Sequence, residues 1–165
     1  MTTLVIQPYR LVDARSLRYQ EQNSPQTLAQ GLAEYYREND GIVTRPELLP
    51  DQSASLFSSH DICHVIFGLD TSLADEMIAD IRTTAACALT WSQVRQRYTD
   101  QQALAVFSQM GLWRAVTVPI RSLPRIASTL VQSFLMPKRW PWVPPREYLD
   151  RSLADLRAEY RIRVL

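Results

Sequence analysis

The chain has 165 residues, of which 46% are hydrophobic, and its 18 basic and 17 acidic side chains give a formal net charge of +1. This length fits a single domain with a sizeable core, and the balanced charge argues against a nucleic-acid partner bound over the whole surface. Two cysteines are too few for a disulfide framework, and the sequence shows neither a signal-peptide pattern nor the ~18 consecutive apolar residues of a membrane span. We therefore expect a cytoplasmic protein that is soluble or peripheral to a membrane.

Helical patterns dominate the first two-thirds of the chain. Ser24 is typical of a helix N-cap and is followed by a proline at the first helical position, and Gly41 is typical of a helix end. After a loop with two prolines, the apolar spacing predicts helices over about 53–67 and 72–89. A further capped helix is expected over about 99–111, where a glycine ends the pattern.

The last third is expected to be helical with interruptions. Pro119 and Pro124 should break the apolar stretch that contains them, with a helix resuming afterwards. Four prolines in the ten residues of MPKRWPWVPP (136–145) predict an irregular segment, and 146–162 carries an apolar stripe at helical spacing. The prediction is a single all-α domain over residues 1–165.

Both histidines of the chain fall in one short segment, HDICHVIFGLDTSLADE (60–76). On a helix, His60 and His64 lie about 40° apart and one turn from each other, and Asp61 lies within the same ~100° arc. Apolar residues share that side of the helix, so the imidazoles should be buried and each ring nitrogen needs a partner. A metal ion would satisfy one nitrogen of each ring.

Glu76 extends this pattern if the chain folds back between the two helices. Gly68 is a helix stop, and Ser72 with Asp75 resembles a capping box, so 53–90 is expected to form a helical hairpin. His64 precedes the glycine by four residues and Glu76 follows the serine by four. The hairpin would therefore bring the glutamate to the height of the histidines.

The predicted metal ligands are His60, Asp61, His64 and Glu76, and the expected ion is zinc, with iron, manganese and magnesium as alternatives. Asp80, one turn after Glu76, is expected to orient a ligand without binding the metal. A solvated helix position is the alternative for Asp80, and a hydrogen-bonded core cluster is the alternative for the whole group. The pattern is not the HExxH of zinc peptidases, no third histidine is present for an HD-type phosphohydrolase, and no catalytic residue is assigned.

The spacing HDxxH-x11-E at 60–76 resembles the signature of the coenzyme Q biosynthesis protein 4 family. The ending LRAEYRI, residues 156–162, is similar to the C-terminal LR-x-E-x-x-I pattern of that family. The likeness is weak between and before these two segments.

The resemblance implies an all-helical homodimer, peripheral to the inner face of the membrane, that acts in ubiquinone biosynthesis. It implies metal binding through His60, Asp61, His64 and Glu76. The expected partners are a polyprenyl lipid or quinone precursor, other ubiquinone biosynthesis proteins and a membrane surface. The expected activity is metal-dependent oxidative decarboxylation of a polyprenyl-hydroxybenzoate, a lyase reaction that replaces the ring carboxylate by a hydroxyl. The alternative is a non-catalytic isoprenoid-binding scaffold with a structural metal.

A membrane or lipid contact is expected at Lys138, Arg139, Trp140 and Trp142, because tryptophans beside cations are typical of membrane interfaces. The alternative is that this proline-rich segment packs its tryptophans onto the domain.

Overall fold

The protein is described by a computed structural model that covers residues 17–40, 51–93 and 112–165, with side chains for 17–40, 58–93 and 122–165. The described chain is mostly helical, which confirms the predicted all-α class, and its strands form only a two-stranded parallel pair. In chain order the elements are η1 (Arg18–Gln20), α1 (Leu28–Glu38), α2 (Asp51–Phe67), α3 (Leu73–Ala86), β1 (Cys87–Ala88), α6 (Leu112–Leu135), β2 (Trp140–Pro141), η3 (Arg146–Asp150) and α7 (Leu153–Tyr160). The helix expected over 99–111 lies outside the described residues, and α1 ends at Glu38, before the end expected at Gly41.

Helix α1 begins later than the sequence suggested. Its N-cap is Thr27, whose hydroxyl accepts a hydrogen bond from the backbone N–H of Gln30, and not Ser24. Ser24 is buried, and its carbonyl accepts a hydrogen bond from the N–H of Ala154. Contact with the start of α7 therefore decides where α1 begins, and an isolated bridge between Thr27 and Ser152 joins the two N-caps.

The two helices predicted on either side of a turn at 68–72 are present as α2 and α3. Gly68 ends α2 with φ of +70°, a conformation that favours glycine, and its N–H donates to the carbonyl of Val65. The next N–H, that of Leu69, donates to the carbonyl of His64 at 2.8 Å. Ser72 then caps α3 by accepting from the N–H of Asp75. The turn is thus held at both ends by hydrogen bonds that these residue types favour.

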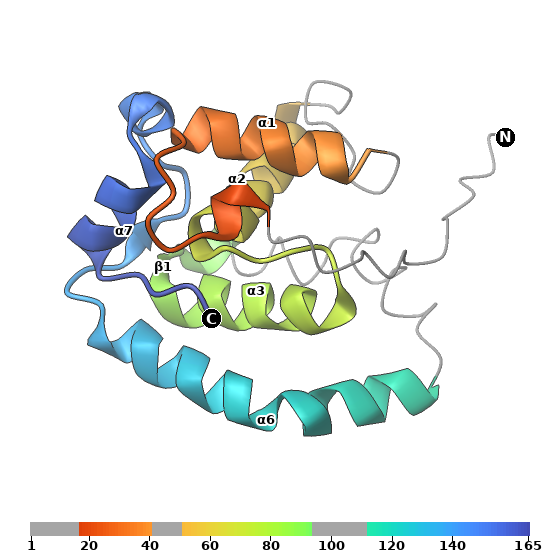
Figure 1. The fold of residues 1–165 in the computed structure, drawn as a ribbon. Helices are drawn as coiled ribbons and strands as arrows, with labels where there is room; N and C mark the ends of the chain where they lie inside the picture. The colour runs from red at the N-terminus through yellow and green to blue at the C-terminus, as the bar shows by residue number, and fades with distance from the viewer. Residues whose placement is uncertain (1–16, 41–50, 94–111) are drawn as a thin grey trace, which may run out of the picture.

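Helix α6 contradicts the predicted interruption by Pro119 and Pro124, because it runs unbroken through both. Each proline lacks an N–H and disfavours a helix interior. Packing along α3 offsets that cost, since the two helices lie side by side over much of their length (Figure 1). Arg125 of α6 also forms an ion pair with Asp75 in the first turn of α3.

The segment after α6 carries the tryptophans assigned to a membrane contact, and that assignment is wrong. Trp140 and Trp142 are buried in the core, where the Trp140 ring packs against Tyr148 and Tyr160. Trp140 belongs to β2, which pairs with β1 and so draws the indole into the domain. The alternative reading, packing onto the domain, is the correct one.

The two cations of that segment also bind within the domain. Lys138 forms an ion pair with Glu159 of α7 and lies over the Tyr160 ring. Arg139 donates to the carbonyl of Cys87 at 3.4 Å. Neither contact requires a lipid.

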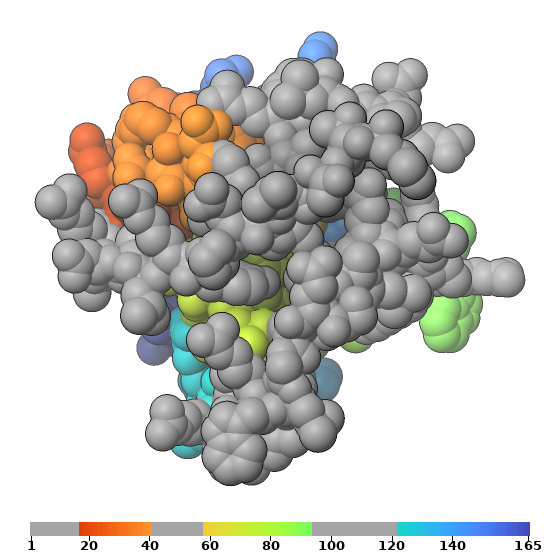
Figure 2. Space-filling view, turned by 90° about the vertical axis from the view of Figure 1, so that its right-hand side faces the viewer, coloured from red at the N-terminus to blue at the C-terminus, as the bar shows by residue number. Residues whose placement is uncertain are grey.

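The helices form stacked layers. Figure 1 shows α1 at the top, α2 behind and below it, α3 beneath these and α6 along the bottom, with α7 against one side. The perpendicular view repeats the order of α1, α3 and α6 from top to bottom (Figure 2). Within the described residues, no helix is both long enough and apolar enough to cross a bilayer.

The expected final helix over 146–162 is divided at Arg151 into η3 and α7. Arg157 of α7 is fully buried and donates to four backbone carbonyls, those of Tyr19, Glu21, Val65 and Ile66. Burial lowers the pKa of Arg157 to about 10, so the group stays charged at neutral pH. This one side chain therefore joins α7 to the end of α2, next to the histidine segment.

Candidate metal centre

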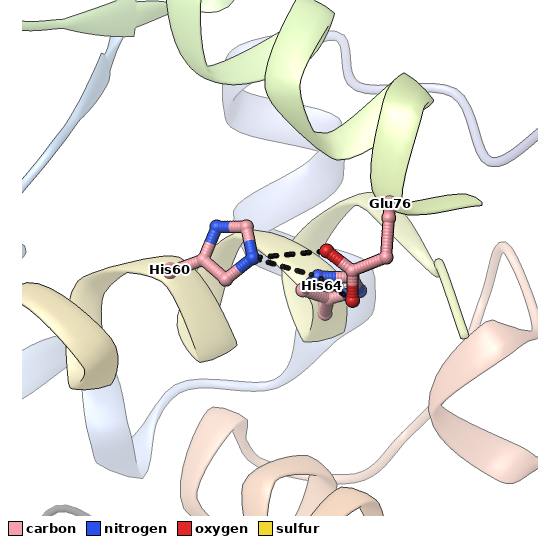
Figure 3. A group of neighbouring side chains, drawn as sticks. All are labelled: His60, His64 and Glu76. Carbon is pink, nitrogen blue, oxygen red and sulfur yellow. Dashed lines mark hydrogen bonds and ion pairs between the residues drawn. The ribbon is translucent and has the colours of Figure 1, made fainter. Parts of the chain in front are cut away.

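Three side chains from the hairpin meet at one point. His60 and His64 project from α2, and Glu76 reaches them from the first turn of α3 (Figure 3). The Nε2 atoms of His60 and His64 lie 3.2 Å apart. The Nε2 of His60 lies 3.3 Å from Oε2 of Glu76, and the Nε2 of His64 lies 3.4 Å from Oε1. The hairpin thus brings three of the four predicted ligands together.

These separations fit a bound metal ion. Two ligand atoms bonded at about 2.05 Å to one tetrahedral ion lie about 3.3 Å from each other. Among the described residues, His60, His64 and Glu76 form a group whose ligand atoms could hold a metal ion. Two imidazole nitrogens and a carboxylate are a donor set that zinc accepts, and iron and manganese accept it as well. These three ligands are compatible with each of the three metals and do not identify which one binds.

Exposure differs between the three side chains. His64 is fully buried, while the side chains of His60 and Glu76 are 20% and 34% exposed. The Nδ1 atom of His64 is buried without a hydrogen-bond partner among the described residues, and the ring stacks on Tyr35 with centroids 5.5 Å apart. The group therefore has a closed side at His64 and a partly open side at His60 and Glu76.

The electrostatics of the group favour a charged Glu76 beside a protonated His64. Burial alone would lower the pKa of His64, but the charge of Glu76 and its hydrogen bond outweigh burial and raise that pKa to about 9. Burial alone would raise the pKa of Glu76, but the charge of His64 and hydrogen bonds from both rings hold it well below its usual range. Without a metal, the pair is a buried imidazolium and carboxylate; a bound cation would replace the proton.

Asp61, the fourth predicted ligand, is not in the three-residue group. Its Oδ2 accepts a hydrogen bond of 2.8 Å from the hydroxyl of Tyr36 on α1, and its side chain is buried. Burial raises the pKa of Asp61 to about 7, although the Tyr36 hydrogen bond and the charge of His64 partly oppose this. Direct ligation by Asp61 remains a prediction.

Asp80 lies one turn further along α3, half-buried, and is not in the three-residue group either. Its backbone carbonyl accepts a hydrogen bond from Thr84. A role for its carboxylate in orienting a ligand remains a prediction.

The sequence reasoning missed the two tyrosines of α1. Tyr35 stacks on the His64 ring and Tyr36 binds Asp61. The sequence offered one signal for this contact: Asp61, beside two histidines expected to be buried, needed a hydrogen-bond donor from another element.

The fold is an all-α domain, and its site is a His–His–Glu group from two consecutive helices, α2 and α3, that could hold a metal ion. No protein-family model, curated protein or solved structure matches the chain.

Proposed function

We propose that this protein binds a divalent metal ion through His60, His64 and Glu76 and acts in ubiquinone biosynthesis as a relative of the coenzyme Q biosynthesis protein 4 family. The observation that carries the metal proposal is the convergence of their ligand atoms at 3.2 to 3.4 Å. The motif spacing over 60–76 supports the family. Zinc is the first choice of ion, ahead of iron, manganese and magnesium.

In this proposal the substrate is a polyprenyl-hydroxybenzoate or a related quinone precursor, and the reaction replaces its ring carboxylate by a hydroxyl. Carbon dioxide leaves, water supplies the hydroxyl oxygen, and external dioxygen accepts the two electrons and becomes hydrogen peroxide. The metal would supply a cationic site for the carboxylate and phenolic oxygens of the ring. His60 and Glu76 form the partly exposed side where such oxygens could approach, and buried His64 anchors the site to α2. Other proteins of the pathway and a second copy of the chain complete the proposed assembly, at the inner face of the membrane.

A non-catalytic scaffold with a structural metal is the second candidate. The complete burial of His64 and the location of the group across the α2–α3 hairpin favour it, because a metal there would hold the two helices together. The two candidates share the metal and differ in whether the exposed side accepts a substrate.

The test is metal content by mass spectrometry of protein purified without a histidine tag, beside a His60→Ala/His64→Ala double variant. We expect near-stoichiometric metal in the native chain and none in the folded variant. Glu76→Ala then separates the candidates. Loss of turnover of prenylated hydroxybenzoate with the fold retained supports the enzyme, and unfolding on chelation supports the scaffold. Absence of metal after supply of zinc, iron, manganese and magnesium would refute both.

A further inference from the structure

Helix α6 exposes its large apolar side chains. Leu123, Leu130, Val131, Phe134 and Leu135 lie at helical spacing on one side, and we call them the α6 apolar face. Phe134 is 77% exposed and Leu135 is 68% exposed.

The residues that α6 buries make this exposure informative. Ser122, Thr129 and Ser133 are buried, and the hydroxyls of Thr129 and Ser133 donate to carbonyls one turn earlier in the same helix. Within 122–135 the inner side thus carries small hydroxyl residues and Ile126, whereas a helix stabilised only by its own domain would place most of its large apolar residues there. The outer face therefore has a use outside the domain.

The charges around the face are positive. From Leu112 to Pro145 the sequence contains five basic residues and no acidic residue, and two of the five, Arg125 and Lys138, pair with Asp75 and Glu159 of other elements. At the end of the helix, Leu135 and Gln132 line a surface hollow of about 820 Å³ together with Arg161 and Arg163. None of the residues lining that hollow is acidic, and both arginines are exposed. The apolar face therefore ends at a basic border.

We infer that the α6 apolar face binds an anionic lipid surface. An apolar helix face beside arginines is the pattern of a helix lying in the membrane interface, with apolar side chains among the acyl chains and cations at the phosphates. A second copy of the chain fits less well, because neither the apolar face nor the residues lining the hollow offer an acid to Arg161 and Arg163.

The α6 apolar face would be the place where the protein contacts the membrane, and only the choice of a membrane as partner rests on the proposed function. The evidence for the contact itself is the exposure and charge of α6. The test is therefore made on both chelator-treated and metal-supplied protein, so that failure of the metal site and failure of this surface are distinguishable.

The experiment is sedimentation with vesicles of phosphatidylglycerol and phosphatidylcholine in equal parts, compared with pure phosphatidylcholine. The native chain should bind the anionic vesicles and release them at high salt. Val131→Ser/Phe134→Ser should lower the partition coefficient by about tenfold or more. Arg161→Gln/Arg163→Gln should lower binding to anionic vesicles only. Trp91→Ser is the matched control, because Trp91 is 85% exposed but lies outside α6.

Circular dichroism and Tm verify that each variant is folded. The inference is overturned if the native chain ignores anionic vesicles, or if Val131→Ser/Phe134→Ser binds as tightly as the native chain. It is also overturned if Trp91→Ser loses as much binding. A variant that converts a dimer to a monomer, without any vesicle binding by the native chain, would show that a second copy covers the face.

Discussion

Replacing Glu76 by glutamine separates the two states of the candidate metal centre. Glutamine keeps the shape of the side chain and an acceptor oxygen, but it removes the negative charge that faces both imidazoles at 3.3 and 3.4 Å. In metal-free protein that charge holds His64 protonated with a pKa of about 9. The variant therefore leaves a fully buried imidazole that burial alone would keep neutral.

The loss of stability expected for metal-free Glu76→Gln follows from the raised pKa of His64. A rise of the His64 pKa from about 6.5 to about 9 corresponds to about 3 kcal/mol. Glu76 is one-third exposed, so solvent screening reduces this to about 1–3 kcal/mol. The stabilisation is complete below the unfolded pKa of His64 and disappears as the pH rises through 9. The lowered pKa of Glu76 means that it also disappears at strongly acidic pH.

A bound metal reverses this pH dependence. The metal needs the unprotonated ring nitrogen, so protons compete with it, and its affinity should rise by up to about tenfold per pH unit for each proton released. The increase in stability on adding zinc should therefore be small near pH 6 and large near pH 9 in the native chain. In Glu76→Gln the increase should be much smaller throughout, because a charged ligand is lost.

The assay is urea unfolding followed by circular dichroism at about pH 6 and about pH 9, with chelator or with zinc. Glu38→Gln is the matched control, since Glu38 is an exposed acid on α1 and lies outside the three-residue group. It should leave both the metal-free stability and the zinc response close to native. The reasoning is refuted if the metal-free loss in Glu76→Gln is the same at both pH values, or if zinc stabilises the native chain more at the lower pH.

Two further substitutions probe the surroundings of the centre. Metal-free Asp61→Asn should be more stable than the metal-free native protein by about 2–4 kcal/mol above pH 7 and similar to it near pH 4. The reason is that the raised pKa of Asp61, about 7, means that folding penalises its charged form. Equal urea midpoints for the two proteins at pH 8 would contradict this. The amide oxygen can still accept from Tyr36. Gly68→Ala should cost about 1–3 kcal/mol and weaken zinc binding, because its φ is +70° and an added Cβ would lie 2.6 Å from the Val164 side chain. Val164→Ala in the same chain should recover part of that loss in urea unfolding, and an unchanged Tm in Gly68→Ala would disprove the strain.

Local sequence chemistry was enough to predict the hairpin and most of the metal centre. The i and i+4 spacing of His60 and His64, the glycine stop and the Ser72 cap each act within a few residues along the chain, so no distant contact was needed. The same holds for the place of Glu76, because it depends only on where the two helices end and begin. The structure brings these three residues together as expected.

Contacts between distant segments decided the rest. Asp61 shares the helix arc of the histidines, yet Tyr36 of α1 provides the hydroxyl that its carboxylate binds. Two prolines remain inside α6 because it packs along α3. Trp140 is buried because β2 pairs with a strand more than fifty residues earlier.

The sequence by itself therefore determined the helical class, the turn and the ligand spacing, which follow from hydrogen bonds and periodicity along the backbone. Only the tertiary structure decided which apolar groups are buried. The free energy of burial depends on the neighbours that a fold provides, so an apolar stripe on α6 and a tryptophan pair after it could not be ranked for exposure until the packing was known.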